Sequence, residues 1–280
     1  ATKRPRPPAP SSPVPQQRGF LARAFRWALI SGGIILFGLL CAIGFAFSSL
    51  PDFKELRTRE SLGKVVRVRA QDGRVILSLG PIYGEWINYQ NIPGVMVDAM
   101  VAVEDRRFRL HPGVDPIGLV RAVQVRLQRG HWAQGGSTIT QQLARNLFLT
   151  NTRTFGRKGR EMILAFAMEA KYSKDEILEL YLNRVYFGGG AYGIDAAARR
   201  FFDHPANILS LEESAIIAGL VKAPSNYSPT ADAKAAVDRS RVVLSVMADA
   251  GVISPSVAAA ARPDQVKLSS GPQQNSLRYF

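Results

Sequence analysis

A run of 24 residues without a charged side chain, from Trp27 to Leu50, constrains this chain more than any other feature. At ~1.5 Å per residue, a helix of this length exceeds the ~30 Å of hydrocarbon in a bilayer. The run therefore predicts a single transmembrane helix over 27–50. A cleaved signal peptide is the alternative, but its apolar core is usually about 7–15 residues long.

The charges on either side of this run predict its orientation. Residues 1–26 contain six basic side chains, six prolines and no acidic residue, so we expect a solvated, disordered arm. Because the flank after the run is mixed in charge, the positive-inside rule places the N-terminus in the cytoplasm and the rest of the chain outside it. This topology argues against nucleic acid as a partner, although the formal net charge of +14 suggests a polyanion.

The part of the chain after the span is predicted to be mainly α-helical. Two short apolar runs around Gln71-Asp72-Gly73 predict a β-hairpin within a connector over 51–92. From Pro93 onward the apolar positions follow a helical spacing, and capping-box pairs predict later helix starts after Thr138, Ser173 and Ser210. We expect one helical domain over 93–262 and a C-terminal linker over 263–280.

Two glutamates are candidates for acid–base chemistry. Glu104 falls at the end of the first helical pattern, where the negative end of the helix dipole favours the protonated carboxyl and makes it a better base. Glu161 falls on a second helical pattern, with its stem on the apolar side. For either residue, the simpler interpretation is a salt bridge to a neighbouring arginine.

Basic side chains gather between these two glutamates. The segment from Glu104 to Glu161 holds eleven Lys or Arg against four acidic residues. Guanidinium groups match phosphate oxygens in bidentate geometry, so these positions predict a phosphate site formed by Arg145, Arg153, Arg157, Lys158 and Arg160. A solvated charged face is the alternative, but next to a membrane span the polyanions within reach are phosphate-bearing lipids.

Five motifs follow the span in a fixed order. They are EDRRFRLHPGVD at 104–115, GGSTITQQLARN at 135–146, RT and RKGRE at 153–161, KDEILELYLN at 174–183, and a glycine- and alanine-rich segment at 192–202. Over roughly residues 65–262 they resemble the motifs of the peptidoglycan glycosyltransferases, or transglycosylases, found in class A penicillin-binding proteins and in monofunctional enzymes. GGSTITQQL alone is highly specific. Arg145 and Arg160 occupy positions where the family often has Lys, so charge is retained but bidentate geometry is added.

The resemblance implies a fold and a reaction. The fold would be mainly α, a lysozyme-like domain of two lobes with a small β-hairpin, preceded by the transmembrane helix. The enzyme would polymerise lipid II into β-1,4-linked glycan strands by inverting transfer. Glu104 would be the general base that deprotonates the GlcNAc 4-hydroxyl, which attacks C1 of MurNAc as undecaprenyl diphosphate leaves. Glu161 would be a second catalytic carboxylate, which either assists departure of the leaving group, directly or through a metal, or orients basic residues.

The resemblance also implies a set of substrate-binding residues. They are Asp105, Phe108, His111, Gly136, Ser137, Thr138, Gln141, Gln142, Arg145, Asn146, Arg153, Arg157, Lys158, Arg160 and Asn183. The basic members would hold the diphosphates of donor and acceptor. A helix over about 116–129 mixes aliphatic residues with arginines, as interfacial helices do, and would lie in the membrane-facing lobe. A soluble amphipathic helix is the alternative for that segment.

The sequence requires no cofactor, because it has one cysteine, Cys41, and its three histidines are scattered. A divalent cation, Mg²⁺ or Mn²⁺, that assists at the diphosphate is left open. The implied partners are lipid II, the growing glycan chain, the lipid bilayer and other proteins of bacterial cell-wall synthesis and division. The implied location is the bacterial inner membrane, with the catalytic domain on its periplasmic face.

Three other classes of protein are weighed against this one. A hydrolase on a lysozyme-like fold would need no diphosphate cluster, a non-catalytic scaffold is expected to lack one of the glutamates, and topology disfavours a tethered nucleic-acid binder. Ser61-Leu62-Gly63-Lys64 satisfies the SxxK pattern, but no KTG follows it, so we expect no transpeptidase in these residues. Leu277-Arg278-Tyr279-Phe280 resembles the segment that joins the two domains of bifunctional relatives, which leaves open whether the chain belongs to a longer enzyme.

Overall fold

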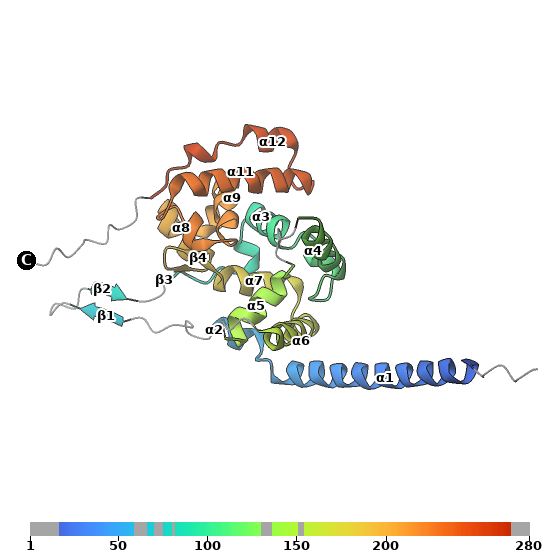
Figure 1. The fold of residues 1–280 in the computed structure, drawn as a ribbon. Helices are drawn as coiled ribbons and strands as arrows, with labels where there is room; N and C mark the ends of the chain where they lie inside the picture. Colours follow the sequence, from blue (N-terminus) through green and yellow to red (C-terminus); the bar gives the residue numbers. More distant parts are fainter. Residues whose placement is uncertain are drawn as a thin grey trace, which may run out of the picture.

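The computed structural model describes residues 17–58, 66–69, 75–79, 82–129, 136–150 and 154–269. Most of them are helical (Figure 1). In chain order the elements are α1 (Gln17–Ser49), α2 (Phe53–Thr58), β1 (Val66–Arg69), β2 (Val75–Leu79), β3 (Ile82–Tyr83), η1 (Tyr89–Asn91), α3 (Gly94–Glu104), η2 (Phe108–Leu110), α4 (Pro116–Arg129), α5 (Ile139–Phe148), α6 (Phe155–Lys171), α7 (Lys174–Arg184), β4 (Tyr186–Gly188), β5 (Ala191–Tyr192), α8 (Ile194–Phe202), η3 (Ala206–Ile208), α9 (Leu211–Leu220), α10 (Pro224–Tyr227), α11 (Ala233–Asp249), α12 (Pro255–Ala260) and η4 (Pro263–Gln265). The expected mainly α fold class, with a small β-hairpin and one long apolar N-terminal helix, is confirmed.

Helix α1 is long and apolar enough to cross a membrane over Arg23–Ser49. It begins at Gln17 rather than at the expected Trp27, so part of the expected disordered arm is helical. Extending a helix that already exists requires no new nucleation, which explains the earlier start. Residues 1–16 of the expected arm lie outside the described residues.

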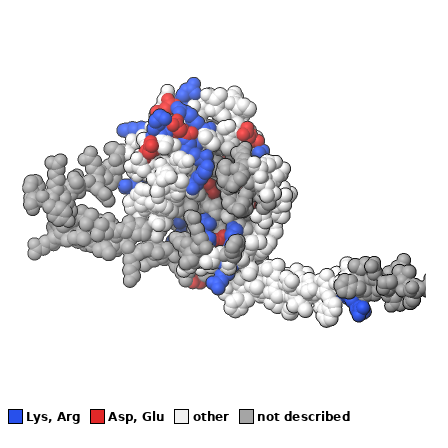
Figure 2. Space-filling view, viewed as in Figure 1, with Lys and Arg blue, Asp and Glu red and all other residues white. Residues whose placement is uncertain are grey.

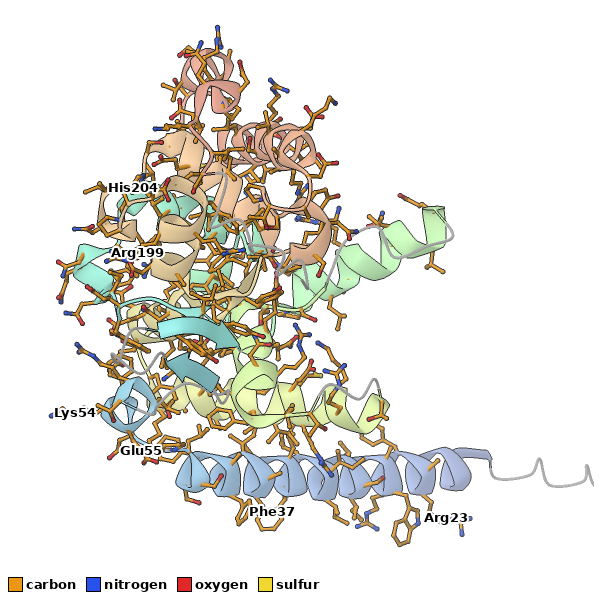
Figure 3. The ribbon with its side chains drawn as sticks, turned by 90° about the vertical axis from the view of Figure 1, so that its left-hand side faces the viewer. Arg23, Phe37, Lys54, Glu55, Arg199 and His204 are labelled. Carbon is orange, nitrogen blue, oxygen red and sulfur yellow. The ribbon has the colours of Figure 1, made fainter. Side chains whose placement is uncertain are left out.

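The C-terminal end of α1 packs beside α6. Ala46 and Leu50 are buried there, whereas most of α1 is exposed and Phe37 points away from the body of the molecule (Figure 3). Lys171 at the end of α6 donates a hydrogen bond to the carbonyl of Leu50, and the hydroxyl of Tyr172 donates to the carbonyl of Pro51. These bonds fix the end of the apolar helix to the helical body.

Two small sheets join the helices. β1 and β2 pair antiparallel, with Val66 opposite Leu79, which confirms the expected hairpin; its turn residues lie outside the described residues. The second sheet has the order β3-β5-β4, with β3 parallel and β4 antiparallel to β5. The second sheet ties the segment before α3 to the loop between α7 and α8.

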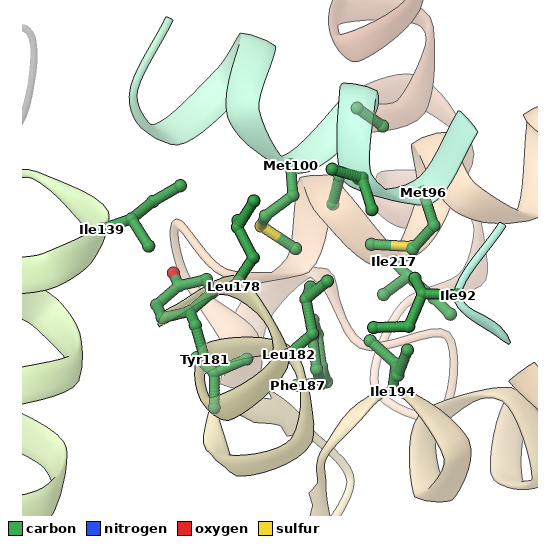
Figure 4. Packing of buried hydrophobic residues seen from close by; sticks show 14 of the residues in the cluster. Ile92, Met96, Met100, Ile139, Leu178, Tyr181, Leu182, Phe187, Ile194 and Ile217 are labelled. Carbon is green, nitrogen blue, oxygen red and sulfur yellow. The ribbon is translucent and has the colours of Figure 1, made fainter. Parts of the chain in front are cut away.

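The hydrophobic core is organised around α7. Every residue from Ile177 to Arg184 is buried, as expected of a helix covered by other helices on all sides. One cluster of buried side chains joins Leu178, Tyr181 and Leu182 of this helix with Met96 and Met100 of α3, Ile139 of α5 and Ile217 of α9 (Figure 4). Since α3, α5 and α7 also carry residues of the predicted site, the core fixes the positions of these three helices.

Local capping decides where several helices begin. Ser173 and Ser210 each form the complete predicted capping box, in which the serine hydroxyl and the glutamate three residues later satisfy backbone amides reciprocally. Thr138 caps α5 by accepting from the Gln141 amide at 3.1 Å, but the Gln141 side chain does not return to Thr138. The box predicted there is only half formed, because that side chain is bound to Lys158 of α6.

Helix α4 projects from the body of the described residues (Figure 3). Its existence over 116–129 confirms the helix prediction. Ile117, Val120 and Leu127 are exposed along it, as is Leu110 just before it. An interfacial environment for these apolar side chains stays a prediction.

Candidate active site

Glu104 is the last residue of α3, as the sequence predicted. Its carboxylate is partly buried, and its Oε2 accepts a hydrogen bond from the Gln142 side chain at 2.8 Å. Burial raises the pKa of the Glu104 carboxyl above its ordinary value of 4.5, against the opposing effects of the Gln142 hydrogen bond and the positive charges of Arg239 and Arg145. A carboxylate in this state is suited to accept a proton.

The residues after Glu104 are fixed to the N-terminus of α5. Asp105 places both carboxylate oxygens 3.0 Å from Nε2 of His111, and it accepts a hydrogen bond from the amide of Ile139 at 3.1 Å. Nδ1 of His111 accepts from the amide of Gly113, whose carbonyl accepts from the Thr138 hydroxyl at 2.6 Å. Asp105, His111 and Thr138 are buried, so their observed role is to hold the segment that carries Glu104.

A partly buried ion pair also supports this segment. Lys174 donates to the carbonyl of His111 at 2.7 Å and forms a salt bridge with Glu169, which also accepts from the Thr140 hydroxyl. Phe108 is completely buried, and its ring lies 4.3 Å below the Lys174 ammonium. The structure therefore places Phe108 in the core, under the site.

A second cluster surrounds Glu161 on α6. This glutamate is 1% exposed and forms salt bridges with Arg157 and Lys158, one helical turn before it. The Lys158 ammonium lies 3.0 Å from Glu161 Oε2, and it donates to the Ser137 hydroxyl at 2.8 Å and to Gln141 Oε1 at 2.9 Å. The structure thus contains the salt bridge to an arginine that was the simpler interpretation of Glu161.

Helix α5 connects the two glutamates. Gln141 binds the Lys158 cluster and the next residue, Gln142, binds Glu104. Adjacent residues of one helix thereby contact the carboxylate with the raised pKa and the cluster of cations around Glu161. In Figure 2 a band of basic side chains runs down the face in view, with acidic side chains between them. Arg145, also on α5, is partly buried near Glu104.

Other predicted residues are less engaged. Gly136, Asn146 and Arg160 are exposed, and none of them takes part in the hydrogen bonds of the two glutamates described above. Asn183 is buried, and its amide binds the backbone of Ile87 in both directions at 2.9 Å. Arg153 lies outside the described residues. A substrate contact for each of these residues stays a prediction.

Two side chains near Glu104 were not singled out from the sequence. The hydroxyl of Tyr181 donates to Gln142 Oε1 at 3.0 Å, behind the hydrogen bond to Glu104. Arg239 on α11 contributes positive charge to Glu104, and its Nε is buried without a hydrogen-bond partner among the described residues. Tyr181 lies within a recognisable motif, whereas Arg239 follows the last motif, so no sequence signal indicated it.

The donor set around Glu161 does not favour a metal ion in this arrangement. Both of its carboxylate oxygens already face cations, Arg157 and Lys158. The described part of the chain has no group of three His, Cys, Asp or Glu side chains arranged to hold a metal. A divalent cation that arrives with a diphosphate stays a prediction.

Comparison with known proteins identifies the family. The description of the matching family is "Transglycosylase", and the match covers residues 72–248. The chain belongs to the transglycosylase family. This transglycosylase chain is 43% identical over 235 residues to penicillin-binding protein 1A of Escherichia coli (strain K12), which covers 84% of the chain and 27% of that protein. It is 44% identical over 184 residues to penicillin-binding protein 1F of Bacillus subtilis (strain 168), covering 66% of the chain and 26% of that protein.

Among solved structures, the transglycosylase chain resembles penicillin-binding protein 1A from Haemophilus influenzae. The TM-score is 0.47 and the sequence identity is 26%, over 76% of this chain and 22% of that chain. The transglycosylase chain spans roughly a quarter of the length of the relatives that it matches.

Proposed function

We propose that this chain is a membrane-anchored peptidoglycan glycosyltransferase that polymerises lipid II into β-1,4 glycan strands. The observation that carries the proposal is the pairing of two unlike carboxylates across α5. Glu104 has a raised pKa and is free of salt bridges among the described residues, whereas Glu161 is neutralised by two cations. Glycosyl transfer from a diphosphate needs a base on one side and positive charge on the other.

In the proposed reaction Glu104 is the general base. It removes the proton from the GlcNAc 4-hydroxyl of the incoming lipid II, and that oxygen forms a bond to C1 of MurNAc at the end of the growing chain. The bond from C1 to the diphosphate oxygen breaks, with inversion at C1, and undecaprenyl diphosphate leaves. A raised pKa suits Glu104 to this step because a general base is most effective when its pKa lies near the pH at which the enzyme works.

Arg157, Lys158 and Arg145 are proposed to neutralise the diphosphate. Glu161 holds the first two of these cations through its salt bridges, so its proposed contribution is to position them beside the leaving group. Bidentate guanidinium contacts match phosphate oxygens, and a lysine adds a compact charge.

The proposed location follows from α1. An apolar helix over Arg23–Ser49, preceded by basic residues, would span the bacterial inner membrane with the N-terminus in the cytoplasm and the catalytic domain in the periplasm. The bilayer and other cell-wall synthesis proteins are the proposed partners.

Lipid II polymerisation by the full chain in detergent tests the proposal. We expect Glu104→Gln, which keeps the side-chain shape and removes the base, to lower the polymerisation rate by about 10²-fold or more. Glu55→Gln on α2, an exposed glutamate away from α3 and α5, is the matched control and is expected to keep wild-type activity. Equal activity of the Glu104 variant and the wild type would place the base elsewhere.

Two further outcomes separate the competing classes. If folded wild-type protein makes no polymer but cleaves preformed glycan strands, the chain is a hydrolase. If it does neither, a non-catalytic scaffold becomes the better interpretation.

A further inference from the structure

The Gln142 side chain that donates to Glu104 also accepts a hydrogen bond, and the donor of that bond is completely buried. Tyr181 on α7 is fully inaccessible, and its hydroxyl donates to Gln142 Oε1 at 3.0 Å. The same amide donates from Nε2 to Glu104 Oε2 at 2.8 Å. The three side chains come from α7, α5 and α3, and they form one line of hydrogen bonds that ends at the carboxylate.

The side-chain amide of glutamine has two ends of opposite character. Turned one way, it offers an N–H donor to Glu104, which favours the ionised carboxylate; turned the other way, it offers an oxygen, which favours the protonated acid. Both ends of Gln142 have partners, and the partner at the far end decides between the two orientations. A tyrosine hydroxyl can also accept, but if the amide were reversed the buried O–H of Tyr181 would lose the amide oxygen to which it donates.

We infer that Tyr181 is a positioning residue for Glu104: its hydroxyl holds the Gln142 amide so that the N–H, rather than the oxygen, faces the carboxylate. The inference rests on the proposed function only in taking Glu104 as the general base. A base must be ionised before it can accept a proton, and the orientation set by Tyr181 favours that state.

Burial explains why this bond has an effect. Tyr181 has no access to water, and burial raises the pKa of its hydroxyl well above 10.0, so the group stays a neutral donor at any pH at which the enzyme works. Because the hydroxyl itself has no access to water, leaving it without the amide oxygen costs more than it would at the surface. The amide is therefore held firmly in one orientation.

Other charges also face Glu104 and have to stay constant in a test. They are Asp105 next to it, Arg145 on α5 and Arg239 on α11. Removing the Tyr181 hydroxyl changes none of these charges. A shift in the titration of Glu104 in a Tyr181 variant would thus report the orientation of the Gln142 amide.

The first experiment compares the pH profiles of kcat/KM for wild type, Tyr181→Phe and Tyr172→Phe in lipid II polymerisation. Loss of the Tyr181 hydroxyl frees the amide to turn its oxygen toward Glu104, so we expect the acid limb to move up by about one pH unit, with activity regained at higher pH. Tyr172→Phe removes a hydroxyl that binds Pro51 at the end of α1, and its acid limb is expected to stay at the wild-type position.

A second variant tests the route through the amide. Gln142→Met removes the N–H donor to Glu104 and should move the acid limb in the same direction. Adding Tyr181→Phe to Gln142→Met should then move it no further, because the hydroxyl acts only through the amide. A further upward shift in the double variant would show that Tyr181 acts on Glu104 by another route. Gln142→Met alone keeps Tyr181, so it still tests the effect of the amide on Glu104 if Tyr181→Phe folds poorly.

A measurement without substrate separates this inference from the proposed function. In the 280-residue chain in micelles with ¹⁵N-labelled glutamine, the Gln142 side-chain amide should titrate with Glu104, and Glu104→Gln should abolish the titration. Tyr181→Phe should raise the midpoint. If wild type makes no polymer but the midpoint moves, the proposed function fails and the positioning role stands. If wild type is active and both midpoint and acid limb stay fixed in folded Tyr181→Phe, the inference is overturned.

Discussion

At the scale of single residues, the partial burial of Glu104 serves chemistry at the expense of stability. Burial raises the pKa of the carboxyl because it disfavours the charged form. In the unfolded chain the same carboxyl ionises in water at its ordinary value of 4.5. Folding therefore moves an ionised Glu104 into a less favourable environment at neutral pH.

This conflict has a pH-dependent signature. Between pH 4.5 and the raised native pKa, the folded state holds a proton that the unfolded state has released, so stability falls as pH rises through this window. We expect Glu104→Gln to raise the melting temperature at pH 7.5 and to lose this advantage below pH 4.5. Thermal unfolding of both proteins across pH checks this, and an advantage that is constant with pH would contradict it.

Glu161→Gln is expected to change the melting temperature in the opposite direction to Glu104→Gln. Glu161 is buried between Arg157 and Lys158, so the variant leaves two cations without their carboxylate. We expect it to lower the melting temperature at neutral pH.

Sequence motifs located most of the side chains of this site but not their roles. Glu104, Gln142, Glu161 and Lys158 were all predicted, and the structure brings each pair into contact. Phe108 was predicted to bind substrate, yet it is buried under Lys174. Motifs record which residues recur together, whereas burial depends on how distant helices pack. For the same reason the contribution of Arg239, which follows every motif, was not predictable.

At the scale of elements, the N-terminal part of α5 connects the two glutamates, because Gln142 contacts Glu104 and Gln141 contacts the Lys158 that pairs with Glu161. Thr138 caps this helix and also binds the carbonyl of Gly113, in the segment that carries Asp105 and His111. Ser210 caps α9 with an exposed hydroxyl in a complete capping box. The two caps have similar chemistry, but only one is connected to the site.

We expect Thr138→Ala and Ser210→Ala each to destabilise the chain by about 1 kcal/mol through loss of an N-cap, with a larger loss at Thr138 because the buried Gly113 carbonyl also loses its donor. Only Thr138→Ala should lower polymerisation when the two variants are compared at equal folded fraction. Denaturant unfolding and activity assays check this. Equal activities would mean that the contacts of Thr138 at the start of α5 do not position Glu104.

Element boundaries were predictable where local chemistry fixes them. The two serine capping boxes and the β1–β2 hairpin follow from nearby residues alone. The start of α1 at Gln17 was not predicted, because charge patterns mark the edge of a membrane rather than the end of a helix. The half-formed box at Thr138 reflects competition from Lys158 on another helix.

At the scale of the whole molecule, the proposed topology is directly testable. In a Cys41→Ala background, Lys234→Cys places a thiol at an exposed position on α11, and Lys3→Cys places one before α1. We expect a membrane-impermeant maleimide to label the first variant in intact spheroplasts and the second only after permeabilisation. The reverse pattern would invert the orientation proposed from the positive-inside rule.

The packing of α1 against α6 has a consequence for how the molecule meets a bilayer. Only Leu50, Pro51 and Asp52 separate α1 from α2, and the first two are bonded through their carbonyls to Lys171 and Tyr172. These bonds attach the end of the helix to the body that carries Glu161 on α6. A spanning helix tilts to match its apolar length to the bilayer. In the proposed arrangement, membrane thickness would be one of the factors that set the angle at which the band of basic side chains in Figure 2 meets the lipid surface.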